Sequence, residues 1–180
     1  MGSPFLLVCF AVQQTIEGKY NCVMKPLAKA QLPTESGSFE VRAYDSGFHD
    51  FPHLVMLSKA QVLEGVAPLV RIHSECWTGD VAGSLKCDCG PQLDTSLKRV
   101  AQDGGAVLYL RQEGRGIGLV EKLKAYNLQD QGLDTYEANE QLGHQRDARK
   151  FDVAAKLLED LGWLEVRLMT NNPDKVSALR

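Results

Sequence analysis

Short apolar runs alternate with segments of helical periodicity along most of this chain, and the alternation restricts the possible folds more than any other feature. Runs typical of β-strands cover residues 39–44, 54–57, 66–73, 106–110 and 166–170. Helical spacing of apolar residues is clearest at 92–102, 116–126 and 151–161. The pattern predicts an α/β (α+β) fold, with a mixed β-sheet core and flanking helices, and leaves the strand order open.

The N-terminal part of the chain gives a weaker signal than the rest. Residues 4–12 form an apolar run that predicts a buried strand. The run is too short to cross a bilayer and no basic residues precede it, so we expect neither a membrane span nor a signal peptide. Residues 31–38 are rich in turn formers. We therefore predict an N-terminal extension of uncertain role over residues 1–30 and a main domain over residues 31–180.

Length and charge narrow the classes of function. A chain of 180 residues fits one domain, or one compact unit with two lobes. The net charge of -3 leaves no basic excess to neutralise the phosphates of DNA or RNA, so we expect no nucleic-acid partner. A small anionic ligand remains compatible with this charge, because a few local arginines and lysines are enough to hold it.

The cysteines are odd in number and unevenly spaced. They are Cys9, Cys22, Cys76, Cys87 and Cys89, and the last three fall within fourteen residues. A secreted disulfide scaffold normally spaces and pairs its cysteines differently. The pattern favours a metal-binding cluster in a reducing cytoplasm.

The cysteine cluster suits a zinc site with three protein ligands. Cys87 and Cys89 are two residues apart, so on an extended backbone their sulfurs point to the same side, and a turn near residues 78–80 brings Cys76 to them. Three thiolates favour Zn²⁺ and leave a coordination position open. Two alternatives stay open: unrelated buried thiols, or a structural zinc site completed by His73 or His144.

Zinc nucleobase deaminases offer a further comparison. They carry an H-x-E motif followed by P-C-x-x-C. His73 and Glu75 match the first motif. Cys87 and Cys89 are separated by one residue and no proline precedes them, so the second motif is absent. We regard this interpretation as the weaker one.

Three further segments carry residues suited to phosphate. Residues 111–118 are glycine-rich, contain Arg111 and Arg115, and lie between a predicted strand and a predicted helix, where backbone N–H groups can face an anion. Asp147 and Arg149 precede the last clear helix. Asp147 could act as a base and Arg149 could contact a phosphate; alternatively, they are an acid at the start of a helix and a solvated arginine. Residues 170–175 follow a strand, where α/β sheets often bind ligands. Plain surface turns remain an alternative for the glycine-rich segment and for residues 170–175.

These motifs, in this order, resemble the GTP cyclohydrolase II family. The residues that carry the resemblance are 71–76, 78–80, 87–92, 111–118, 125–132, 134–135, 137–139 and 170–173. It extends from about Leu32 to the C-terminus and makes residues 31–180 the catalytic domain. It implies a cytoplasmic, homodimeric, zinc-dependent hydrolase that opens the imidazole ring of GTP and releases formate and pyrophosphate. The product would be a diaminopyrimidinone ribosylamine 5′-phosphate, formed in the first step of riboflavin biosynthesis.

The resemblance also implies roles for individual residues. Cys76, Cys87 and Cys89 would hold one Zn²⁺, while Mg²⁺ would accompany the triphosphate. Asp147 matches the proposed proton acceptor, Arg149 the proposed nucleophile toward the α-phosphorus, and Tyr126 a tyrosine near the guanine. The implied GTP contacts are Arg71, Ile72, His73, Ser74, Glu75, Gln92, Glu113, Gly114, Arg115, Thr135, Thr170 and Lys175.

Two departures from the family pattern accompany this resemblance. The chain ends at Arg180, whereas family members usually continue for some tens of residues, so we expect a C-terminal tail to be missing. Residues 1–28 match no part of the family pattern, and the dihydroxybutanone phosphate synthase domain that is fused to this enzyme in some organisms is absent. A function of another class therefore stays open, namely a zinc-stabilised GTP-binding regulatory module without turnover.

Overall fold

The computed structural model describes residues 5–11, 24–47 and 51–179. Its centre is a seven-stranded sheet with the order β1-β7-β5-β6-β4-β3-β2. In chain order the strands are β1 (Leu6–Ala11), β2 (Ala28–Thr34), β3 (Gly37–Tyr44), β4 (His53–Ser58), β5 (Leu69–Ser74), β6 (Gly105–Leu110) and β7 (Glu165–Thr170).

The sheet is mixed, as the sequence predicts. β2, β3 and β4 form an antiparallel meander, and β4 continues antiparallel to β6. β5 runs parallel to both β6 and β7, while β1 pairs antiparallel with β7 at the opposite edge. The three parallel strands therefore end on the same side of the sheet, where α/β folds commonly bind ligands.

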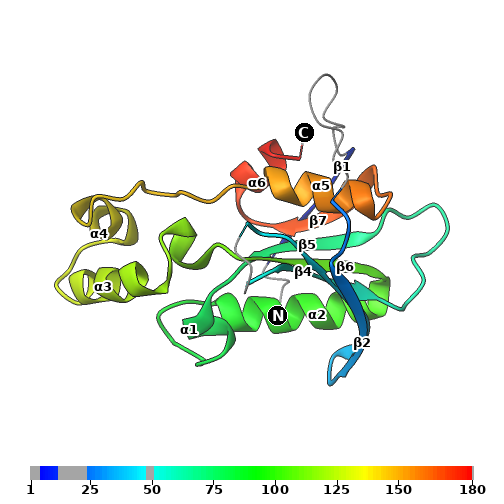
Figure 1. Cartoon of the computed structure of the whole chain (residues 1–180), viewed down its shortest axis with the longest axis horizontal. Helices are drawn as coiled ribbons and strands as arrows, with labels where there is room; N and C mark the ends of the chain where they lie inside the picture. Colours follow the sequence, from blue (N-terminus) through cyan, green and yellow to red (C-terminus); the bar gives the residue numbers. More distant parts are fainter. Residues whose placement is uncertain (1–4, 12–23, 48–50, 180) are drawn as a thin grey trace.

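Helices cover both faces of the sheet (Figure 1). The helical elements are α1 (Trp77–Asp80), α2 (Cys89–Asp103), the 3-10 turn η1 (Glu113–Gly116), α3 (Leu119–Gln129), α4 (Thr135–Gln141), α5 (Asp152–Asp160) and α6 (Pro173–Ser177). Figure 1 shows α2 against one face, α5 and α6 against the other, and α3 with α4 extending beyond one end of the sheet.

The alternation of side chains along β5 divides the core and aims two polar residues at one face. Val70 and Ile72 pack with the core on the α5 side, which also contains Leu157. Leu69 packs on the α2 side with Val100. Because side chains two residues apart share a face, Arg71 and His73 point to the α2 side with Leu69. The strand pattern thus places two charged or titratable groups beside α2.

The N-terminal predictions need two corrections. Residues 31–34 belong to β2, and the turn is confined to residues 35–36. Pro33 reads as a turn former in the sequence, but a proline is tolerated in an edge strand such as β2. The predicted N-terminal strand exists as β1, yet it is an edge strand with Leu7 45% exposed, not a buried one.

Much of the predicted extension over residues 1–30 lies outside the described residues, and so does Cys22. Its boundary with the domain over residues 31–180 stays a prediction. Within the described ranges, no helix combines the length and the apolar character that a membrane crossing requires.

Candidate active site

A cavity of about 720 Å³ opens at the carboxyl ends of the parallel strands. Its walls come from the end of β5, the N-terminus of α2, η1, α3, α4, the segment before α5, and the segment from β7 into α6. The predicted site residues that line it are Arg71, His73, Ser74, Glu75, Cys76, Cys87, Cys89, Gln92, Glu113, Gly114, Arg115, Tyr126, Thr135, Asp147, Arg149, Thr170 and Lys175. Residues separated by more than a hundred positions, such as Arg71 and Lys175, therefore meet in one cavity.

Ile72 is the predicted site residue that does not line this cavity. Its side chain is fully buried in the core on the α5 side. Its carbonyl oxygen accepts a hydrogen bond of 2.8 Å from Lys175 Nζ. Ile72 therefore touches the site through its backbone, by holding a lysine that lines the cavity.

Three cysteines gather at one end of the cavity. The sulfurs of Cys76, Cys87 and Cys89 all lie within 4.8 Å of one another, and the Cys76 and Cys87 sulfurs are 3.6 Å apart. The local structure differs from the extended backbone expected for Cys87 and Cys89, because Cys89 is the first residue of α2. The turn expected near residues 78–80 is present as α1, which directly follows Cys76.

Gly79 in α1 makes room for the three sulfurs. A Cβ atom on Gly79 would lie 2.8 Å from the Cys87 sulfur and 3.2 Å from the Cys76 sulfur. Such contacts are too close for a side chain, so only glycine lets α1 pass this near to the thiols. The room left by the glycine, together with three soft donors, fits a metal ion such as Zn²⁺.

The two histidines considered as additional ligands have other partners. His73 Nε2 lies 3.0 Å from a carboxylate oxygen of Asp80, and His144 Nε2 lies 3.4 Å from Glu121. Within the described ranges, the group of residues with metal-ligand spacing consists of the three cysteines alone. The contacts therefore give no support to a structural zinc site completed by either histidine.

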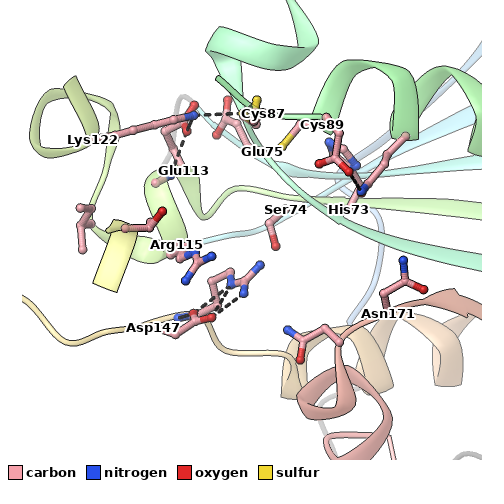
Figure 2. A pocket seen from close by; sticks show the side chains of 18 of the residues that line it. His73, Ser74, Glu75, Cys87, Cys89, Glu113, Arg115, Lys122, Asp147 and Asn171 are labelled. Atoms are coloured by element: carbon pink, nitrogen blue, oxygen red, sulfur yellow. Dashed lines mark hydrogen bonds and ion pairs between the residues drawn. The ribbon is translucent and has the colours of Figure 1, made fainter. Parts of the chain in front are cut away.

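Charged groups surround Cys76 in particular. Lys122 Nζ donates to the Cys76 sulfur at 3.0 Å and to Glu113 at 2.8 Å (Figure 2). A hydrogen bond from Cys89, and a further one from Lys122, lower the pKa of Cys76 to about 4 against the opposing effect of burial. The same contact with Cys76, together with burial, raises the pKa of Cys89. We call the three cysteines Cys76, Cys87 and Cys89, together with Asp80, Glu113 and Lys122, the thiol end of the cavity.

Asp80 organises the backbone next to the first cysteine. Its carboxylate accepts hydrogen bonds from the Cys76 backbone N–H at 3.0 Å and from the Tyr109 hydroxyl at 2.8 Å, besides its contact with His73. An ionised carboxylate at Nε2 selects the His73 tautomer with its proton on that nitrogen. Nδ1 of His73 is then a hydrogen-bond acceptor, and it is buried without a partner among the described residues.

Tyr126 joins the thiol end through a threonine. Its hydroxyl lies 3.1 Å from Thr78 Oγ1, which in turn lies 3.6 Å from the Cys76 sulfur. The ring also has Lys86 Nζ 5.1 Å and Lys122 Nζ 5.8 Å from its centroid. These contacts place two cations near the tyrosine ring at the cavity wall.

The glycine-rich segment adopts an unusual backbone. Gly114, Arg115 and Gly116 have φ angles of 61°, 60° and 92°, and Arg115 is the non-glycine residue with positive φ within the described ranges. Left-handed backbone is costly for an arginine, so surrounding contacts must hold it. The Arg115 carbonyl accepts from the Ala148 N–H at 3.0 Å, and its guanidinium lies 4.5 Å from the Tyr136 ring.

Positive charges gather on the rest of the cavity wall, and two of them, Arg71 and Lys175, lie close enough to Cys89 to interact with its charge. Arg71 is 6% exposed and Lys175 5% exposed, and neither donates to a carboxylate among the described residues. Burial, and then repulsion from Arg71 and Arg149, lower the pKa of Lys175 to about 7. Burial also lowers the pKa of Arg71 to about 10. We call Arg71, Arg115, Arg149 and Lys175 the cation end of the cavity.

Asp147 supplies the carboxylate that pairs with Arg149. Arg149 Nε donates to both carboxylate oxygens, at 2.9 and 3.1 Å, and a second guanidinium nitrogen completes a fork. Burial opposes ionisation, yet the hydrogen bonds from Arg149 lower the pKa of Asp147. Figure 2 shows that Asp147 faces Arg115, and that Asp147 lies across the cavity from Glu113 and the labelled cysteines. One guanidinium nitrogen of Arg115 is buried without a partner among the described residues.

Comparison with known proteins identifies the relatives of this chain. The sequence model of the GTP cyclohydrolase II family matches residues 25–180. This chain belongs to the GTP cyclohydrolase II family. The riboflavin biosynthesis protein RibBA of Bacillus cytotoxicus is 50% identical over 150 residues, which cover 83% of this chain and 38% of the relative. RibBA of Bacillus velezensis is 46% identical over 176 residues, which cover 96% of this chain and 44% of the relative.

The chain thus spans roughly two fifths of the length of these curated relatives of the GTP cyclohydrolase II family. Among solved structures, RibBX of A. baumannii, described as a two-domain 3,4-dihydroxy-2-butanone 4-phosphate synthase, is similar with a TM-score of 0.42. It is 23% identical, and the match covers 84% of this chain and 35% of that chain.

Some residues of this GTP cyclohydrolase II family site were not predicted from the sequence. Lys122 and Tyr136 line the cavity. The Asp80 carboxylate contacts the His73 ring and the Cys76 backbone N–H. Lys122 and Tyr126 are four residues apart on α3, so a shared helix face was the available signal for the lysine. Asp80 belongs to a segment that carries the resemblance, but its role follows only from the folded contacts.

Proposed function

We propose that this chain catalyses the GTP cyclohydrolase II reaction, the hydrolytic opening of the imidazole ring of GTP with release of formate and pyrophosphate. The observation that carries the proposal is that one cavity joins the thiol end to the cation end. GTP has a purine that requires an activated water and a triphosphate that requires cations. Membership of the GTP cyclohydrolase II family supports the same substrate.

The cation end is suited to the triphosphate. Arg71 and Lys175 are buried cations that lack a carboxylate partner in the described contacts, and the pKa of Lys175 is lowered by burial and by neighbouring positive charge. A polyanion removes this like-charge repulsion, so its binding relieves an unfavourable feature of the free protein. Arginine forks match phosphate oxygens in geometry as well as in charge. Mg²⁺ carried by the triphosphate would offset part of its charge.

The thiol end is suited to the reacting ring. Cys76, Cys87 and Cys89 would hold Zn²⁺, which supplies Lewis acidity and makes a water molecule nucleophilic near neutral pH. His73 Nδ1 is a buried acceptor without a partner among the described residues, and it suits an N–H group of the purine. Tyr126, fixed through Thr78, would orient the ring against the thiol end.

Asp147 and Arg149 would act where the phosphoanhydride breaks. The fork between them keeps Asp147 ionised, which suits a group that accepts a proton or steers a water. A guanidinium is in general a poor nucleophile, and the nitrogens of Arg149 that form the fork already donate to Asp147. We propose that Arg149 stabilises negative charge on the phosphoryl group, in place of the covalent role that the resemblance implies.

The test is incubation of the protein with GTP, Zn²⁺ and Mg²⁺, with formate, pyrophosphate and nucleotide products measured in the same sample. We expect formate and pyrophosphate in equal amounts, together with a ring-opened monophosphate. A Cys87→Ser sample prepared in parallel controls for contaminating phosphatases. GTP recovered intact from protein that retains zinc would refute turnover and support a zinc-stabilised binding module instead.

The resemblance further predicts a homodimer in the cytoplasm. We propose this assembly for the present chain as well. Sedimentation equilibrium at micromolar concentration tests it, because a monomer at the highest concentration would contradict the proposal.

A further inference from the structure

A buried pair of opposite charges lies directly beside one of the three cysteines. The Lys122 and Glu113 side chains are 12% and 9% exposed, and their charged atoms are 2.8 Å apart. They come from α3 and η1, nine residues apart in the sequence. Both approach Cys76, which belongs to a third segment. Burying such a pair carries a desolvation cost, so its hydrogen bonds must be well made.

Glu113 has its carboxylate oxygens occupied by the protein itself. One oxygen accepts from the Trp77 backbone N–H at 2.5 Å, at the residue that follows Cys76. The other accepts from the Gly114 N–H and from Lys122, each at 2.8 Å. Glu113 therefore connects η1, α3 and the first residue of α1. Its position fixes both the lysine and the backbone next to the cysteine.

Lys122 makes Cys76 different from the other two cysteines. Its ammonium donates to the Cys76 sulfur at 3.0 Å, while the contacts described for Cys87 and Cys89 involve the neighbouring cysteines. Three thiolates around a divalent cation leave a net charge of about -1, and a single ammonium offsets it. A thiolate that accepts a charged hydrogen bond also donates less electron density to its metal.

We propose that Lys122 and Glu113 are positioning residues of the metal centre, with the Lys122 ammonium withdrawing charge from the Cys76 sulfur and Glu113 holding that ammonium in place. This inference rests on the proposed function, because it requires Cys76 to ligate the metal. It assigns the electronic asymmetry of the three-cysteine site chiefly to the one hydrogen bond whose donor is charged. The consequence is a metal with stronger Lewis acidity than three unperturbed thiolates would give.

The test replaces zinc with Co²⁺, whose sulfur-to-cobalt charge-transfer absorption reports the charge on the thiolates. Lys122→Met should move this absorption to longer wavelength, because an unperturbed sulfur gives up electrons more readily. Metal affinity, measured by competition with a chelator, should fall by about 10-fold, because the ammonium no longer offsets the net negative charge of the three-thiolate site. Lys122→Arg should restore both properties, since it keeps a cationic donor. Lys124→Met is the matched control, because Lys124 is an exposed lysine of the same helix that pairs with Glu121.

The outcomes separate this inference from the proposed function. If the wild-type protein binds Co²⁺ with thiolate absorption and Cys87→Ser does not, the thiol site stands. An absorption in Lys122→Met that matches the wild type and the Lys124→Met control then overturns the inference alone. If the wild-type protein shows no thiolate absorption, the inference and the proposed metal site both fail.

Folding of the variants is checked by circular dichroism before any metal is added. If Lys122→Met does not fold, Lys122→Gln takes its place, because glutamine keeps an N–H donor without the charge. We expect a smaller displacement of the absorption in the same direction. A glutamine variant with the wild-type absorption would show that the charge of Lys122 has no effect on the sulfur, and would overturn the inference.

Discussion

At the thiol end of the cavity, each charged group described has a partner of the opposite kind. Asp80 holds His73 and the Cys76 backbone, and Lys122 links Glu113 to the Cys76 sulfur. At the cation end, Asp147 pairs with Arg149 alone in the described contacts. Arg71 and Lys175 donate to no carboxylate there, and one guanidinium nitrogen of Arg115 has no partner.

This difference indicates how the two ends work. A network whose charged groups are paired before any ligand arrives holds those groups in fixed positions, which suits a metal and the chemistry next to it. A group of like charges without partners is unfavourable in the free protein and becomes favourable when an anion enters. Changes at the thiol end should therefore affect the metal and the ring, whereas changes at the cation end should affect the phosphates.

The largest effect should come from Cys87→Ser. Loss of one of three thiolates should weaken zinc binding by about 100-fold or more and stop formate release. Binding of a non-hydrolysable GTP analogue should remain within about threefold of the wild type, because the cation end is intact. Zinc content by atomic absorption, formate release and analogue titration check this. Full zinc content with full activity would remove Cys87 from the ligand set.

Arg149→Ala should affect the opposite end. It removes a guanidinium from the phosphate site and leaves the Asp147 carboxylate without its fork, so pyrophosphate release should fall by about 100- to 1000-fold. Zinc content should be unchanged. The measurement is pyrophosphate release under saturating GTP, with metal analysis of the same sample. Turnover close to the wild-type rate would reduce Arg149 to a surface charge.

Lys175→Met should have opposite effects on the stability of the free protein and on its affinity for phosphate. The buried ammonium has a lowered pKa because burial and positive neighbours disfavour its charge, so removing it should raise the melting temperature of the free protein by a few degrees (about 2–4 °C). Affinity for inorganic tripolyphosphate should fall by about 10- to 100-fold. Calorimetric melting and titration test both effects. A lower melting temperature would contradict the account of an unfavourable buried charge.

Tyr126→Phe should have a smaller effect, restricted to the thiol end. The variant keeps the ring and loses the hydroxyl that contacts Thr78, so formate release should slow by about 10-fold through less accurate orientation. Tripolyphosphate affinity should not change. A variant that alters only the apparent GTP affinity would indicate that Tyr126 binds substrate without orienting it.

The smallest effect is the uptake of a proton by Lys175 when an anion binds. With a Lys175 pKa of about 7, most free protein at pH 8 carries a neutral lysine, and an anion beside it raises that pKa. Binding of tripolyphosphate at pH 8 should therefore take up about one proton. Titration calorimetry in two buffers of different ionisation enthalpy measures it. Equal heats in both buffers would contradict the assignment.

The same lysine makes the stability of the free protein depend on pH. In the unfolded chain the lysine binds its proton up to about pH 10.5, and in the folded protein up to about pH 7. Between these values the unfolded state holds more protons, so the contribution of this group to stability should rise with pH. Lys175→Met should remove that rise from the melting curves.

The sequence predicted the cysteine cluster and the described strands other than β2, because both depend on local patterns. Apolar runs located β3, β4, β5, β6 and β7, although β5 begins at Leu69, three residues later than predicted. α4 was not predicted because its residues are mostly polar, although Asp134 and Glu137 form the capping box that starts it. Cys89 was placed on extended backbone, yet it begins α2, since the helical pattern becomes apparent only from Gln92.

The contacts between side chains within the site could not be predicted from sequence spacing. Lys122 reaches the Cys76 sulfur across 46 positions, and Asp80 reaches His73 only because α1 folds back over β5. The left-handed backbone of Arg115 lies between glycines that the sequence led us to interpret as an anion-binding segment or a plain surface turn. Burial of Lys175 also depends on α6, which the sequence suggested only as a turn. These features arise from packing between elements that are distant in the chain.

Anomalous diffraction at the zinc absorption edge would show how GTP is oriented between the cysteines and the cations of the cavity. Crystals would be grown with Zn²⁺, Mg²⁺ and a non-hydrolysable GTP analogue. We predict an anomalous peak among Cys76, Cys87 and Cys89, the guanine next to it, and the triphosphate among Arg115, Arg149 and Lys175. A zinc peak elsewhere, or a triphosphate directed at the three cysteines, would contradict the account.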